Sequence, residues 1–70
     1  MEIIRMPMAG RIASIRVREG QQVSAGDTVG IFESMKMQMP LVAPAAGVVS
    51  RVLVTEGAFA DQDAPLFEIT

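Results

Sequence analysis

The chain has 70 residues, half of them hydrophobic, a formal net charge of −2, and neither cysteine nor histidine. This length predicts one small domain, residues 1–70, with no disulfide, thiolate zinc site, cysteine nucleophile or histidine base. The acidic balance and the lack of Tyr and Trp argue against nucleic acid as a partner, because phosphate binding and base stacking need basic and aromatic side chains.

The first half of the chain reads as three extended segments separated by turns. The segments are Glu2 to Met6, Arg11 to Arg18 and Thr28 to Ser34. Glu19-Gly20 and Ala25-Gly26-Asp27 have the composition of tight turns, in which glycine supplies positive φ. No stretch keeps the 3.6-residue apolar stripe of a helix over three turns.

The second of these segments alternates apolar and charged residues. Ile15 and Val17 alternate with Arg16 and Arg18, which predicts a strand with one buried and one solvated face. Ile12 is out of phase with Ile15, so we expect a bulge or twist between them.

The second half of the chain repeats the first after a shift of 37 residues. The shift places Pro7 to Gly10 on Pro44 to Gly47, Val17 to Gly20 on Val54 to Gly57, and Val29 on Leu66. It predicts further strands over Met39 to Val42, Val48 to Thr55 and Pro65 to Thr70, with a turn at Asp61-Gln62-Asp63 and with Val17 and Val54 as equivalent buried residues. An internal repeat of about 1–35 and 38–70 indicates a pseudo-twofold, all-β fold, a flattened sandwich or barrel.

A lysine lies between the two repeats. Lys36 is the only lysine in the chain, and the strands expected over Thr28 to Ser34 and Met37 to Val42 would meet at Met35-Lys36. A two-residue hairpin turn favours Asn-Gly or Asp-Gly, because both central residues need positive φ. Met and Lys break this rule, which makes the tip a candidate functional site. The repeat places this tip at one end of the fold and both termini at the other.

The tip has a nucleophile but no catalytic apparatus. Well under about 0.1% of a free lysine is neutral at pH 7, and no histidine is present to act as a base. Lys36 is therefore not expected to be a Schiff-base catalyst, and the chain is not expected to be an enzyme. Two readings stay open at this point: a solvated lysine that aids solubility, and an acceptor of an activated acyl group supplied by another enzyme, which needs only exposure and recognisable neighbours. Asp61 and Asp63 are read as turn residues and not as a metal site.

No segment has the features of an export signal or a membrane span. Met1 to Arg5 contains an acid where a signal peptide has basic residues. The longest weakly polar stretch, Met39 to Val49, is interrupted by Pro40, Pro44 and Gly47. We therefore expect a soluble cytoplasmic protein that does not interact with membranes.

The residues around Lys36 resemble a known signature. Glu33-Ser34-Met35-Lys36-Met37 is similar to the E-(A/S)-M-K-M motif of biotinyl domains, the carriers of biotin-dependent carboxylases. Flanking segments resemble the family as well, so that the resemblance covers essentially the whole chain; they are Pro7 to Gly10, Val17 to Gly20, Val23 to Asp27, Ala43 to Gly47 and Val54 to Gly57. The bare domain is most similar to free-standing bacterial biotin/lipoyl attachment proteins or to a piece of a carboxylase subunit.

The resemblance implies a function for the tip. Lys36 would carry covalent biotin, transferred from biotinyl-adenylate by biotin protein ligase, with Glu33, Ser34, Met35 and Met37 as recognition residues. The biotin would accept CO₂ at a biotin carboxylase site and deliver it at a carboxyltransferase site.

Two alternatives share the same fold. One is a lipoyl carrier, in which the residue before the lysine is typically Asp, whereas Met35 occupies that position here. The other is an unmodified interaction module in which Lys36 has no special role.

Overall fold

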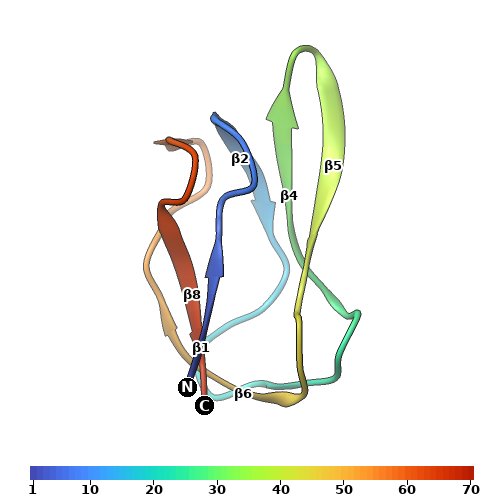
Figure 1. The fold of residues 1–70 in the computed structure, drawn as a ribbon, viewed down its shortest axis with the longest axis vertical. Helices are drawn as coiled ribbons and strands as arrows, with labels where there is room; N and C mark the ends of the chain where they lie inside the picture. Colours follow the sequence, from blue (N-terminus) through green and yellow to red (C-terminus); the bar gives the residue numbers. More distant parts are fainter.

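Eight β-strands joined by turns form the computed structural model, which describes residues 1–70. The strands are β1 (Glu2–Arg5), β2 (Gly10–Ile15), β3 (Gln22–Val23), β4 (Thr28–Ser34), β5 (Met37–Val42), β6 (Gly47–Val52), β7 (Phe59–Ala60) and β8 (Pro65–Ile69). All strand pairs are antiparallel, and they form two four-stranded sheets with the orders β1-β8-β6-β3 and β5-β4-β2-β7. Figure 1 labels the six longer strands. The all-β fold predicted from the sequence is therefore confirmed. The structure has no helix of the length and apolar character that crossing a membrane requires.

The two sheets have the same topology, related by the 37-residue shift. Adding 37 to the bounds of β2 and β3 gives the bounds of β6 and β7, and β4 and β8 begin 37 residues apart. Replacing each strand by its equivalent converts one sheet order into the other. Both halves also carry a bulge, because the register shifts between Ile12 and Ser14 and again between Val49 and Arg51. These bulges explain the change of phase between the apolar residues of each strand.

The core lies between the sheets and is entirely apolar. No polar or charged residue is buried. The thirteen buried hydrophobic residues are Ile4, Met6, Ile12, Val23, Val29, Phe32, Leu41, Ala43, Val49, Ala60, Leu66, Phe67 and Ile69. Full burial of one large apolar side chain contributes roughly 1.5–3 kcal/mol, so this cluster is the main source of stability in a chain without disulfides.

A reciprocal pair of carboxylates joins the halves. The backbone N–H of Ile15 donates to Glu56 Oε2 at 2.8 Å, and that of Val52 donates to Glu19 Oε2 at 3.1 Å. The two donors, Ile15 and Val52, are equivalent positions of the repeat, and so are the two acceptors, Glu19 and Glu56. Each glutamate therefore links its own half of the chain to a strand of the other half by an equivalent hydrogen bond.

These two hydrogen bonds lie at the ends of two strands that are shorter than predicted. The sequence favours strands over Arg11 to Arg18 and Val48 to Thr55, whereas β2 ends at Ile15 and β6 ends at Val52. A side-chain carboxylate takes the last backbone N–H of each strand, and the chain then turns through Gly20 or Gly57, with φ of 91° and 87°.

Burial of the residues beyond these strand ends also differs from the prediction. Val17 and Val54 lie outside the strands and are half-buried against the core, not fully buried. The two-residue strands β3 and β7 were not predicted, because they are too short to show an alternating pattern.

The hairpin of β4 and β5 and the chain termini lie at opposite ends of the molecule (Figure 1). The principal extents of the molecule are 30 × 18 × 17 Å, and the hairpin tip and the termini lie at the two ends of its longest axis. The end of the hairpin is therefore far from both termini.

Candidate functional site

The β4–β5 hairpin closes in a two-residue turn. Glu33 pairs with Gln38 and Ser34 pairs with Met37, which leaves only Met35 and Lys36 between the strands. Their φ values are 53° and 65°, the positive values that a type I′ turn requires at both central positions. The local geometry thus presents Lys36 at the outermost point of the hairpin.

Both turn side chains point into solvent. Met35 is 86% exposed, and Lys36 is also exposed. Met37, the first residue of β5, is 62% exposed. Two apolar side chains therefore flank the lysine without contributing to the core, as is common on surfaces that recognise a partner.

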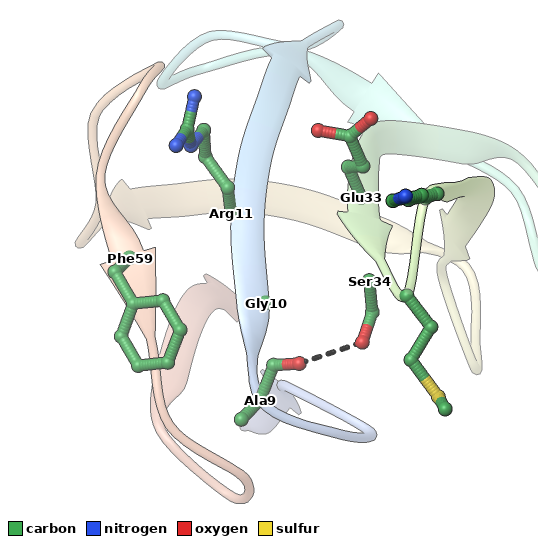
Figure 2. A pocket seen from close by; sticks show the side chains of 8 residues that line it. Ala9, Gly10, Arg11, Glu33, Ser34 and Phe59 are labelled. Atoms are coloured by element: carbon green, nitrogen blue, oxygen red, sulfur yellow. Dashed lines mark hydrogen bonds between the residues drawn. The ribbon is translucent and has the colours of Figure 1, made fainter.

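The base of the hairpin is held against the preceding loop and strand. The Ser34 hydroxyl donates a hydrogen bond to the Ala9 carbonyl oxygen at 2.9 Å (Figure 2). At Gly10, a Cβ atom would lie 2.5 Å from the Glu33 carbonyl oxygen, so β2 approaches β4 more closely there than any other residue would permit. These contacts fix where the turn projects, although the turn itself is open to solvent.

A shallow hollow lies beside the tip. It is lined by Ala9, Gly10, Arg11, Glu33, Ser34, Met35, Lys36 and Phe59. The hollow brings Lys36 together with three of the four predicted recognition residues, while Met37 is not among the lining residues. Arg11 and Phe59 come from β2 and β7, and the sequence did not single them out (Figure 2). The signal that could have found Phe59 is an aromatic residue at the position where the other repeat has Gln22.

The chemical content of the site is a single amine. No group of three His, Cys, Asp or Glu side chains in the chain could hold a metal ion. Glu33 is the one carboxylate that lines the hollow, and it is exposed. The arrangement thus presents an amine nucleophile on a fixed projection and has no paired acid and base beside it.

Comparison with known proteins is consistent with this geometry. Residues 2–69 match the biotin/lipoyl family profile described as "Biotin-requiring enzyme". The biotin/lipoyl attachment protein of Bacillus subtilis is 37% identical over 67 residues, which cover 96% of this chain and 92% of that protein. A pyruvate carboxylase of Aspergillus niger is 45% identical over 51 residues, which cover 73% of this chain but only 4% of the carboxylase.

Solved structures give the same fold. The urea carboxylase of Kluyveromyces lactis superposes with a TM-score of 0.92 at 29% identity, over 99% of this chain and 6% of that chain. This chain therefore corresponds in length to the small attachment protein and to one small part of the carboxylases. With its match over residues 2–69, the chain belongs to the biotin/lipoyl attachment family.

Proposed function

We propose that residues 1–70 form a biotin carrier domain in which Lys36 is the covalent attachment site. The observation that carries this proposal is the position of the only lysine, exposed on a hairpin turn with positive φ at the end of the fold remote from the termini. Biotin joins a protein through an amide bond, which needs an accessible primary amine and room for a second protein to approach. Lys36 meets both requirements.

The attachment step needs a partner that activates biotin. A biotin protein ligase would supply biotinyl-adenylate, and the deprotonated Lys36 Nζ would attack its acyl carbon. The new C–N bond forms, the bond from carbon to the phosphate oxygen breaks, AMP leaves, and the amine proton passes to solvent. Glu33, Ser34, Met35 and Met37 are the proposed recognition residues, since they surround the amine along the hairpin.

Once bound, biotin supplies the nitrogen that carries a carboxyl group between a biotin carboxylase site and a carboxyltransferase site. The chain itself contributes the tether and the orientation. A tethered group is presented to each site at a high effective concentration, so transfer becomes nearly intramolecular. A pyruvate carboxylase and a urea carboxylase are among the similar proteins, which supports this role.

The test is the substitution Lys36→Arg. Arginine keeps the positive charge but is not deprotonated at neutral pH, so it cannot accept the acyl group. Wild type and variant are incubated with a bacterial biotin protein ligase, ATP and biotin, and incorporation is detected with streptavidin. We expect incorporation in the wild type and none in the variant, and an equal signal from both would refute the assignment.

A further inference from the structure

One of the three phenylalanines lies outside the core. Phe32 and Phe67 are fully buried, whereas Phe59 is 68% exposed on the two-residue strand β7. Single exposed apolar residues are common and need no explanation by themselves. The pseudo-twofold repeat, however, supplies an internal comparison: the residue equivalent to Phe59 is Gln22, which is also exposed. Folding of this motif therefore does not require an aromatic side chain here.

The strand partner of Phe59 departs from the repeat as well. Arg11 pairs with Phe59 between β2 and β7, and in the other half Val48 pairs with Gln22 between β6 and β3. The pair Val48 and Gln22 lies near the termini, since the backbone N–H of Val48 donates to the carbonyl oxygen of Thr70 at 3.0 Å. An arginine and an aromatic ring thus occur together only in the half of the surface that carries Lys36.

Both of these residues line the hollow that Lys36 lines (Figure 2). Gly10 forms part of the lining between them and the hairpin, where β2 lies in close contact with β4. Strand β7 is two places from β4 in its sheet, which corresponds to a separation of about 10 Å. Lys36 lies in the turn about two residues beyond Glu33, which adds about 7 Å along the strand and gives a total distance of about 12 Å. A lysine side chain extended by the valeryl chain of biotin has a comparable length, so a ring carried on Lys36 can reach Phe59.

We infer that the hollow is a resting site for the bicyclic ring of biotin carried on Lys36, an inference that rests on the proposed function. The Phe59 ring packs against the apolar face of the bicycle. The Arg11 guanidinium donates a hydrogen bond to the ureido oxygen, and the Glu33 carboxylate accepts one from a ureido N–H. Arg11 and Glu33 are paired across β2 and β4, so a donor and an acceptor are presented side by side, as the ureido group requires.

The test measures the environment of the biotin ring in the loaded chain. Wild type and the variants Phe59→Gln and Arg11→Val are loaded by a bacterial ligase, and intact mass verifies one biotinyl group per chain. Each substitution introduces the residue of the other repeat at the equivalent position, so the fold is expected to tolerate both. In the wild type, NMR should show cross-peaks between the biotin ring protons and the Phe59 ring, with upfield shifts of the biotin resonances. Both signals should be lost in Phe59→Gln. The hydrogen bond from Arg11 should move the ureido carbonyl carbon downfield in the wild type, and this shift should be lost in Arg11→Val.

The control is the double variant Gln22→Phe, Phe59→Gln, which moves the aromatic ring to the equivalent position near the termini and should not restore the signals. Biotin resonances in the loaded wild type that equal those of free biotinyl-lysine would overturn the resting site while leaving the carrier function intact. A wild-type chain that gains no biotinyl mass would overturn the proposed function, and the resting site with it.

Discussion

The two residues of the hairpin turn adopt a backbone conformation that their side chains disfavour. Met35 and Lys36 have φ of 53° and 65°, and the left-handed region costs a non-glycine residue roughly 1 kcal/mol or more. Met35 has no compensating contact with the core, because it is 86% exposed. The residue types at the tip are thus poorly suited to folding, and recognition by a partner is the role that their exposure leaves for them.

Replacing Met35 with Asn separates folding from recognition. Asn tolerates positive φ better than Met, so Met35→Asn should leave the free energy of unfolding unchanged or raise it by up to about 1 kcal/mol. The same change removes an apolar side chain next to Lys36, so the initial rate of biotin incorporation should fall. A urea melt of the unmodified protein and a ligase assay measure the two quantities.

Met37 provides the matched control. Like Met35 it is exposed, but it lies in β5 and does not have positive φ. Met37→Asn therefore removes an exposed methionine without reducing the backbone strain of the turn. Met37→Asn should therefore not increase stability. If Met35→Asn lowers stability and leaves the biotinylation rate at the wild-type value, both parts of the interpretation of the tip are wrong.

At the scale of the elements, the close approach of β2 to β4 positions the hairpin. A Cβ atom at Gly10 would lie 2.5 Å from the Glu33 carbonyl oxygen, which is backbone and cannot rotate away. Gly10→Ala should therefore destabilise the protein by about 1–3 kcal/mol and displace the base of the hairpin. We expect a lower denaturation midpoint and slower biotin incorporation at a temperature where the variant is still folded.

Gly47 is the equivalent residue near the termini and serves as the control. A Cβ atom there would lie 2.6 Å from Ile69 Cγ2 and 2.7 Å from the Thr70 carbonyl oxygen. Gly47→Ala should cost similar stability without slowing biotin incorporation, because it disturbs the end of the molecule remote from Lys36. Equal slowing by both variants would show that the rate follows general stability and not the position of the hairpin.

At the scale of the whole molecule, the repeat predicts matched contributions from equivalent residues. Val17 and Val54 are half-buried, so Val17→Ala and Val54→Ala should each cost about 1 kcal/mol, with similar values for the two. Val29 is fully buried, and Val29→Ala should cost about 2–3 kcal/mol by adding a cavity to the lost burial. Denaturant midpoints measure all three, and a Val17 variant as unstable as the Val29 variant would contradict the observed burial.

The repeat explains how much of the fold could be predicted. Alternation of apolar residues and turn glycines are local signals, so several features could be predicted from them. These features are the bounds of β4 and β5, the two bulges, and the positive φ of Gly20 and Gly57. The ends of β2 and β6 do not follow from such patterns. The last N–H of each strand binds a carboxylate that is 41 or 33 residues away in the sequence, and a local pattern does not show this contact.

Only the part of the candidate site that lies along the hairpin could be predicted, because sequence patterns show local features and not contacts between distant residues. Residues 33–37 are contiguous, so a motif could mark them. The hydrogen bond from Ser34 to Ala9 and the place of Arg11 and Phe59 in the hollow depend on how distant strands pack. Composition also suggests burial for an aromatic residue, but Phe59 is on the outer face of β7, and the next residue, Ala60, is the one that is buried.

The most direct test of the central claim is the mass of the protein purified from its native host. Intact mass followed by mapping of the peptide that contains Lys36 distinguishes biotin, lipoate and no modification in one measurement. The carrier assignment predicts a biotinyl group on Lys36. A lipoyl group on that peptide, or an unmodified Lys36 throughout the sample, would contradict it.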